Sequence, residues 1–286
     1  MTSVRTCVFL LIFLWSSASG ASQINYLLNT NWATSSTQNG FDPALSVDGI
    51  NNPRAYAGAP CPAPQDSHCD RGWALFHNSS NVYEDADAVF ETLSNVAEDK
   101  LVLTLSFRYN VRFLFGSLQI QATSDDRDNF ANNDSSNGSL GDDWVTIIPL
   151  SVSFLDYDSN GPIDGQSSLF VDTTRGNPAN GELFIAATGA VYPLTTSSAY
   201  PNGADYIIVL DNPFPGSLSG IRVNTLYNSD LPVNTQTPLG GPGTQSGNAI
   251  LTEITLSPVP EPSTALLLGI GLVGMAGCRR RQLGAL

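Results

Sequence analysis

Basic side chains are scarce in this chain of 286 residues. Lysine and arginine together number 12 against 26 aspartates and glutamates, so the formal net charge is −14 at pH 7. Such an acidic surface is expected to repel nucleic acids and other anionic polymers unless cations intervene. We therefore expect no nucleic-acid partner.

Groups that commonly carry catalysis are also few. Histidine occurs only twice, and the chain has no Gly-x-Ser-x-Gly elbow, no His-Glu-x-x-His zinc motif and no Walker-type phosphate loop. A cluster of acids can imitate the carboxylate pair of a glycosidase, and it comprises Glu84, Asp85, Asp87 and Glu91. In so acidic a chain such clusters are usually solvated surface. The sequence therefore predicts a protein that is not an enzyme.

No apolar run is long enough to span a bilayer comfortably. The C-terminal run from Ala265 to Cys278 has 14 residues, which is about 21 Å as a helix, whereas a span needs about 20 residues. The N-terminal run from Cys7 to Trp15 follows Arg5 and precedes the small residues Ala18-Ser19-Gly20. This order is typical of a cleaved signal peptide, so residues 1–20 are predicted to direct export.

The last 28 residues have an ordered set of parts. A Pro-Glu-Pro box precedes the apolar run, and three arginines follow it, a charge that favours the cytoplasmic side of a membrane. The box and the basic cluster comprise Val259, Pro260, Glu261, Pro262, Arg279, Arg280 and Arg281. Residues 259–286 resemble the PEP-CTERM sorting signal. A simple tail anchor is the alternative.

The resemblance to the PEP-CTERM signal implies a partner and a location. Bacterial exosortases are thought to recognise this signal and remove it at the Pro-Glu-Pro box. The implied protein associates transiently with the inner membrane through its tail. It then reaches the cell surface, the outer membrane or the extracellular matrix of a Gram-negative bacterium.

Four cysteines are present, and two of them, Cys7 and Cys278, lie in the terminal segments. The remaining pair, Cys61 and Cys69, belongs to an exported region, where an even number of cysteines favours disulfide formation. We expect a disulfide between them. A metal site with the nearby histidines is the alternative, but it lacks further thiols.

Residues 21–258 are predicted to form one domain, because all-β sandwiches reach this length as a single unit. Helical periodicity is almost absent, and short alternating runs are separated by Gly, Pro, Asn and Asp, which predicts an all-β, antiparallel fold. The expected strands are Leu101–Phe107, Ser117–Thr123, Trp144–Ile148, Leu183–Ala187, Tyr206–Leu210, Gly220–Leu226 and Ala249–Leu256. The polar segments Asp125–Asp143 and Asn228–Asn248 are expected to be surface loops.

Alternation in the strand that begins at Gly220 predicts its orientation. Ile221 and Val223 should face the core, whereas Arg222 and Asn224 should face the other way. Arg222 is suited to hold a carboxylate.

Three stretches resemble discoidin-type, galactose-binding-like modules common in planctomycete-type exported proteins. They are Ala33–Ser36 with Ala44–Gly49, then Ala88–Thr92 with Gly116–Ile120, and finally Ser219–Val223 with the blocks between Leu231 and Glu253. The resemblance spans most of residues 24–256 and departs from the pattern between Asp156 and Ala204. It implies an antiparallel β-sandwich of the jelly-roll type.

The same resemblance implies a structural calcium ion. In such modules a glutamate near the final strand and residues around the Asp-Gly turn often hold one calcium. The matching positions here are Asp48, Asn51 and Glu253. The alternative is that Asp48 forms an Asx-turn and Glu253 pairs with an arginine.

A second candidate calcium site lies within one short segment. Oxygen ligands at alternate positions before a glycine turn resemble an EF-hand loop, and they are Asp156, Asp158, Asn160 and Asp164. The twelfth position is Ser167 rather than the bidentate glutamate, and no flanking helices are apparent. A solvated turn is the alternative.

Sugar sites usually combine an aromatic platform with a few polar groups. Trp73 lies beside the Cys61–Cys69 loop, and with Arg71 and Tyr56 it is the predicted ligand-binding set, whereas Trp144 is expected to be structural. The sequence thus favours an exported surface or matrix protein that binds an exopolysaccharide or other surface glycan without catalysis. A purely structural surface protein is the alternative.

Overall fold

The computed structural model describes residues 28–34, 43–47, 72–75, 86–107, 114–131, 143–158, 161–187, 203–226 and 249–259. This part of the chain is built from antiparallel strands and three short 3-10 turns, η1 (Pro43–Ser46), η3 (Arg127–Asn129) and η4 (Pro178–Asn180). The predicted all-β class is confirmed. Among the described residues no helix is long and apolar enough to cross a membrane.

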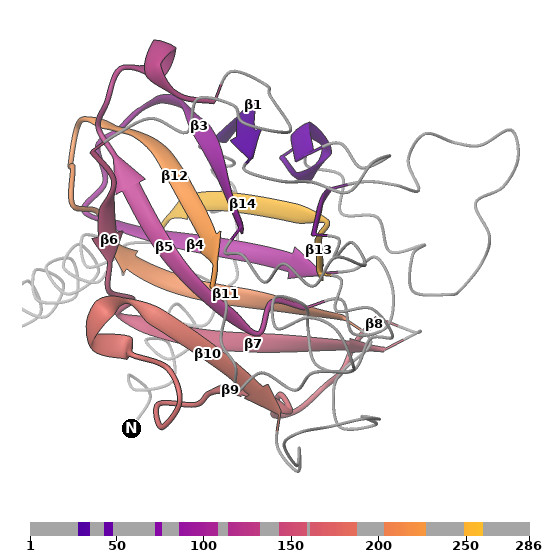
Figure 1. Cartoon of the computed structure of the whole chain (residues 1–286). Coiled ribbons are helices and arrows are strands. Elements are labelled where there is room, and N and C mark those ends of the chain that lie inside the picture. Colours follow the sequence, from indigo (N-terminus) through magenta and orange to yellow (C-terminus); the bar gives the residue numbers. More distant parts are fainter. Residues whose placement is uncertain are drawn as a thin grey trace, which may run out of the picture.

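The larger sheet has seven strands. Its order is β1-β3-β12-β5-β10-β9, and β6 pairs with β5. The strands are β1 (Leu28–Thr34), β3 (Ala86–Val96), β5 (Ser117–Thr123), β6 (Val145–Ile147), β9 (Leu169–Val171), β10 (Glu182–Ala187) and β12 (Leu218–Thr225). The order does not follow the sequence, since β12 inserts between β3 and β5 (Figure 1).

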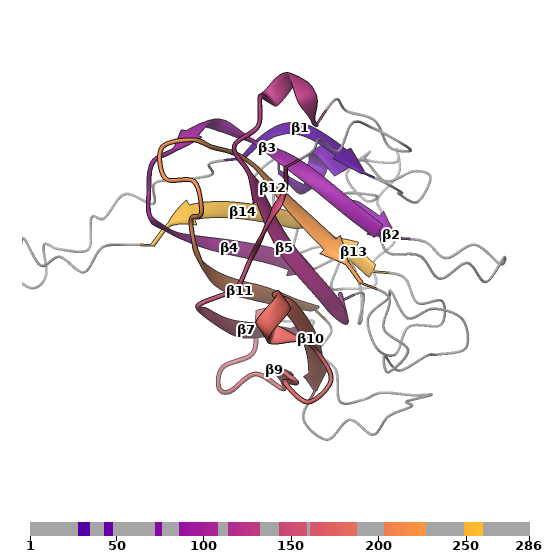
Figure 2. The ribbon, with the colours of Figure 1, turned by 60° about the vertical axis from the view of Figure 1, so that its left-hand side comes forward.

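The second sheet has five strands in the order β14-β4-β11-β7-β8. They are β4 (Lys100–Phe107), β7 (Ser151–Asp158), β8 (Gly161–Pro162), β11 (Gly203–Asp211) and β14 (Glu253–Pro258). A small two-stranded sheet joins β2 (Trp73–Leu75) to β13 (Ala249–Leu251). The second view shows the two larger sheets as layers with strands crossing at an angle (Figure 2).

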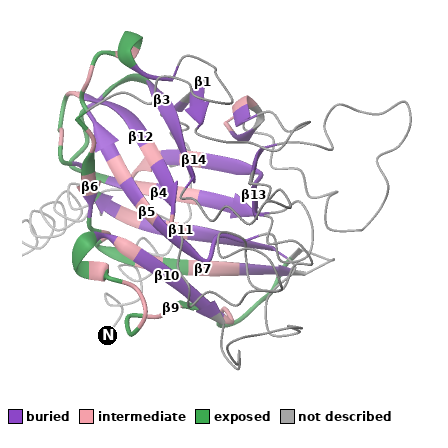
Figure 3. Cartoon of the chain, in the orientation of Figure 1, coloured by how far each residue is buried: buried purple, intermediate pink, exposed green. Residues whose placement is uncertain are grey.

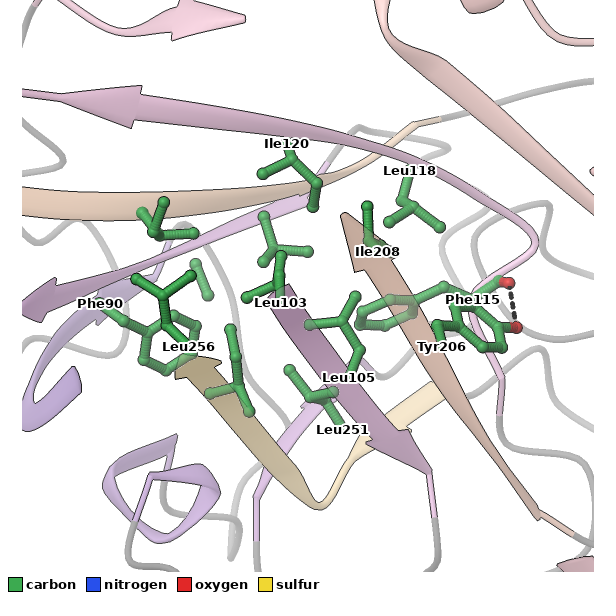
Figure 4. Close-up of a cluster of buried hydrophobic side chains, with 14 of the residues drawn as sticks. Phe90, Leu103, Leu105, Phe115, Leu118, Ile120, Tyr206, Ile208, Leu251 and Leu256 are labelled. Carbon is green, nitrogen blue, oxygen red and sulfur yellow. Dashed lines mark hydrogen bonds between the residues drawn. The ribbon is translucent and has the colours of Figure 1, made fainter. Parts of the chain in front are cut away.

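The core lies between the two larger sheets and contains side chains from both. Leu118 and Ile120 on β5, and Leu103 and Leu105 on β4, are all fully buried. Figure 4 shows these residues converging, with the Tyr206 hydroxyl donating a hydrogen bond of 2.8 Å to the Phe115 carbonyl. That bond satisfies the polar end of a buried tyrosine. The arrangement is sandwich-like.

The structure confirms most of the expected strands, and β5 has the expected bounds, Ser117–Thr123. The expected strand Ala249–Leu256 is wrong as one element, because it divides at Thr252 into β13 and β14, which belong to different sheets. Both the Thr252 N–H and its hydroxyl donate to the Ser106 carbonyl, at 2.8 and 2.9 Å. This contact lies where the chain passes from the two-stranded sheet to the five-stranded one.

Candidate functional site on the outer face of the seven-stranded sheet

Alternate residues of β3, β12 and β5 point away from the core and form a polar surface across the sheet. Asn224 on β12 is the register partner of Asp87 on β3 and of Gln119 on β5. Arg222, two residues earlier, is the partner of Gln121 on β5. Because side chains at i and i+2 share a face, these residues lie together. Asp87 and Asn224 are only 8% and 9% exposed, whereas Gln119, Gln121 and Arg222 are partly exposed, and Figure 3 shows the partly exposed positions as bands on β5 and β12. We call this set the outer-face site.

A row of amides runs across the outer-face site. The Asn224 Nδ2 donates to Gln121 Oε1 at 2.9 Å, and Gln121 Nε2 donates to the Thr146 hydroxyl at 3.1 Å. Farther along, Gln119 Nε2 donates to the Asn180 carbonyl at 2.9 Å. A carboxamide has two donor hydrogens and a two-lone-pair oxygen. Each glutamine therefore keeps hydrogen-bonding capacity that a ligand can use while its orientation is fixed by the protein.

Arg222 stands at the centre of the outer-face site. Its Nη2 donates to the Asp87 carboxylate, which confirms the expectation that Arg222 holds a carboxylate. The guanidinium also lies 5.8 Å from the centre of the Trp144 ring, within the range of a cation–π contact. The Arg222 Nε is buried and has no hydrogen-bond partner among the described residues.

An apolar cluster closes one side of the outer-face site. Phe130 is buried against Ala33 and Val89, and Trp144, which is partly exposed, packs edge-on against it with ring centres 5.6 Å apart. A side chain at Gly220 would clash, because its Cβ would lie 2.6 Å from Phe130 Cε2. Glycine on β12 thus lets the Phe130 ring lie directly on the sheet.

The short turn η3 holds Phe130 in this position. The Asp126 carboxylate accepts a hydrogen bond of 3.2 Å from the Asp128 N–H and caps the turn. Arg127 Nε then donates to the Thr92 carbonyl at 3.1 Å and pairs with the Glu91 carboxylate at 3.2 Å. Glu91, a member of the acidic cluster noted in the sequence, is therefore buried in an ion pair that ties η3 to β3.

Trp73 does not form the expected exposed platform. It is fully buried in β2, and its ring packs edge-on against Phe115 with centres 5.5 Å apart. Its neighbours in the expected ligand set, Arg71 and Tyr56, lie outside the described residues. The aromatic side chain that borders a polar, partly exposed surface is instead Trp144, which the sequence led us to expect as structural.

The structure describes only part of the EF-hand-like segment. Residues 156–158 end β7, and Asp158 pairs with Gly161 in a β7–β8 hairpin. The Asp156 carboxylate is buried and accepts bonds from Ser167 and from both the N–H and the hydroxyl of Ser168, the latter two at 2.8 and 2.7 Å. Asp164 is exposed beyond the hairpin, and Asn160 lies outside the described residues. Asp156 is thus held by serines, and because Asn160 and the Asp158 side chain lie outside the described residues, the calcium site of this segment stays a prediction.

Glu253 is buried at the start of β14. Its register partner is Ser106, which on its other side faces Asp205 on β11. The Asp205 carboxylate accepts a bond of 2.7 Å from the Tyr157 hydroxyl. Within the described ranges no group of three or more His, Cys, Asp or Glu residues is placed to hold a metal ion. Asp48, Asn51, Cys61 and Cys69 lie outside those ranges, so the calcium site around Asp48 and the disulfide stay predictions.

One carboxylate has a pKa well explained by its contacts. The Thr174 hydroxyl donates to Asp172 at 2.6 Å, and with the Thr174 N–H and the nearby Arg175 it lowers the pKa of Asp172 against a smaller opposing effect of burial. The Asp172 N–H in turn donates to the Phe184 carbonyl. This residue organises the turn between β9 and β10 at the edge of the sheet.

The last described residues lead into the sorting segment. β14 ends at Pro258, and the Val259 N–H still donates to the Lys100 carbonyl at 3.1 Å. Residues 258–281 match the PEP-CTERM protein-sorting motif. The chain carries this sorting signal. The signal identifies an exported protein of Gram-negative bacteria that is processed by an exosortase-type enzyme. No curated protein matches the chain.

Proposed function

We propose that the protein is a non-catalytic binding module that holds a neutral polysaccharide at the bacterial surface or in the extracellular matrix. The observation that carries the proposal is the outer-face site, where a row of oriented amides lies beside the partly exposed Trp144. Carboxamides donate to and accept from hydroxyl groups, and an aromatic ring packs on the apolar face of a sugar.

The net negative charge of the protein favours a neutral polysaccharide over an acidic one. Without the two terminal segments, the chain keeps 8 of its 12 basic residues and 25 of its 26 acidic ones, a net charge of −17. The arginine of the site is already paired with Asp87. An acidic polysaccharide would therefore meet repulsion without a free cation to offset it, whereas a neutral chain needs only hydroxyl contacts.

The amides also suit binding to an extended chain rather than to a single sugar. Neighbouring strands are about 4.8 Å apart, so side chains on β3, β12 and β5 line a surface that continues across strands. Gln119 and Gln121 lie two residues apart on β5, so a polymer that runs along this strand can contact both, beside the buried Asn224. Many weak contacts along a polymer are sufficient for retention of a surface protein.

The proposal is tested by affinity electrophoresis of the processed protein in gels that contain neutral or acidic polysaccharides. We expect retardation by at least one neutral polysaccharide and none by the acidic ones. Each gel is run with calcium and with a chelator, because calcium at the predicted Asp48 site is expected to strengthen retention. Mobility that no polysaccharide changes, for protein with a folded β spectrum, would favour the alternative of a purely structural surface protein.

A further inference from the structure

The sorting motif and the folded sheet overlap in sequence. The motif begins at Pro258, which is also the last residue of β14 and the register partner of Leu101 on β4. Val259 follows and remains hydrogen-bonded to β4 through the Lys100 carbonyl. No spacer therefore separates the fold from the Pro-Glu-Pro box, which starts at the next residue, Pro260.

The preceding part of β14 is firmly held. Ile254 and Leu256 are buried in the core, and the strand pairs with β4 from Glu253 to Pro258. Because β14 is the edge of its sheet, only β4 restrains it through backbone bonds. In an antiparallel pair the N–H of every second residue points to the partner strand. Since the Val259 N–H points to β4, the ring nitrogen of Pro258 faces the open edge, where a missing donor is tolerated.

Enzymes that act on a peptide bond commonly bind several residues of the substrate in extended form through its backbone groups. Just before the Pro-Glu-Pro box, the Val259 N–H cannot offer a hydrogen bond to an enzyme while it donates to the Lys100 carbonyl on β4. We propose that Pro258 and Val259 detach from β4 before the processing enzyme acts, so that fraying of the end of β14 controls removal of the tail. This inference rests on the sorting motif and is independent of polysaccharide binding.

The same geometry orients the domain during sorting. From Val259 to the start of the apolar run at Ala265 is six residues, at most about 20 Å of extended chain. The end of the five-stranded sheet that faces the enzyme is therefore the one at which Lys100 pairs with Asp211 at 2.6 Å. Leu150, which is exposed, lies at the same end, because its N–H donates to the Val209 carbonyl on β11.

The proposal is tested by inserting six glycine and serine residues between Ser257 and Pro258, which leaves the matched motif intact and frees it from β4. The control carries the same insertion after Gly165, an exposed turn residue whose Cβ position is open. Tail removal is followed in the producing cells by pulse-chase. We expect the first variant to be processed at least threefold faster than the parent, and the control to be processed at the parental rate. Equal rates for all three proteins would overturn the proposal, as would slower processing of the first variant in a folded protein.

A second measurement does not depend on the insertion. In the full-length precursor held in detergent, we expect hydrogen exchange at the Val259 amide to be at least tenfold slower than in an unstructured peptide. A peptide covering residues 257–264 serves as the reference. Exchange at the peptide rate would show that the motif is already detached and would overturn the proposal.

Discussion

The two larger sheets have similar inner faces, but the middles of their outer faces differ. On the five-stranded sheet the middle presents side chains typical of strands, such as Thr104 and Ile207, and two acidic residues of the same face, Asp205 and Glu253, are buried near one end. The corresponding surface of the seven-stranded sheet carries two partly exposed glutamines beside the buried Asp87 and Asn224. Asparagine and aspartate are depleted in strands because they fit a pleated surface poorly. Residues that oppose the local preference are expected at functional sites. On this face they stand beside partly exposed amides, which is why we propose binding here.

The largest expected effect comes from removing the aromatic cover of the seven-stranded sheet, which Phe130 provides. Phe130→Ala leaves a cavity above Gly220 and should lower the free energy of unfolding by about 3 kcal/mol. Chemical denaturation measures the loss. Phe170, an exposed ring on β9 of the same sheet, is the matched control, and Phe170→Ala should cost less than about 0.5 kcal/mol. Equal losses in the two variants would contradict the packing described for Phe130.

The ion pairs of the two sheets give the second comparison. The Arg222 and Asp87 side chains are 23% and 11% exposed, whereas those of Lys100 and Asp211 are 54% and 57% exposed. Arg222→Ala should therefore cost about 2 kcal/mol, and Lys100→Ala less than about 1 kcal/mol. Thermal unfolding of both variants at low and high salt checks this. If added salt reduced the stabilisation by the Arg222 pair more than that by the Lys100 pair, the fold would not shield the Arg222 pair from solvent.

The smallest expected effect concerns pH at the edge of the seven-stranded sheet. Because the folded state lowers the pKa of Asp172, its contribution to stability is present above the unfolded pKa of about 3.9. The contribution is lost as the pH falls through the folded pKa. Asp172→Asn should therefore be less stable than the parent at pH 7, and the difference should shrink below pH 4. A difference that stays constant down to pH 2 would rule out this linkage.

Local patterns in the sequence predicted the strands best. Alternation along Ser117–Thr123 is regular, and it predicted the bounds of β5. The orientation of Arg222 and Asn224 was predicted for the same reason. The division at Thr252 could not be predicted, because apolar alternation continues from β13 into β14 while the hydrogen-bonding partner changes.

The outer-face site depends on contacts between residues that are far apart in the sequence, and local patterns do not reveal such contacts. Asp87, Gln121 and Arg222 come together only because β12 inserts between β3 and β5, an order that no periodicity indicates. Trp73 and Trp144 are equally hydrophobic, and only the packing places one in the core and leaves the other partly exposed. The useful signal was Arg222 and Asn224 alternating with apolar residues along one strand, which could have directed attention to β12.

The central claim is that one outer face binds ligand and the other does not. The most direct test compares two double variants of the processed protein by isothermal titration with the neutral polysaccharide that gives the strongest retardation. Gln121→Ala with Asn224→Ala changes the seven-stranded sheet, and Ser153→Ala with Thr255→Ala changes the five-stranded one. We predict at least a tenfold loss of affinity in the first pair and unchanged affinity in the second, with both variants folded at the temperature of the titration. Undiminished binding by a folded Gln121 and Asn224 variant would contradict the assignment.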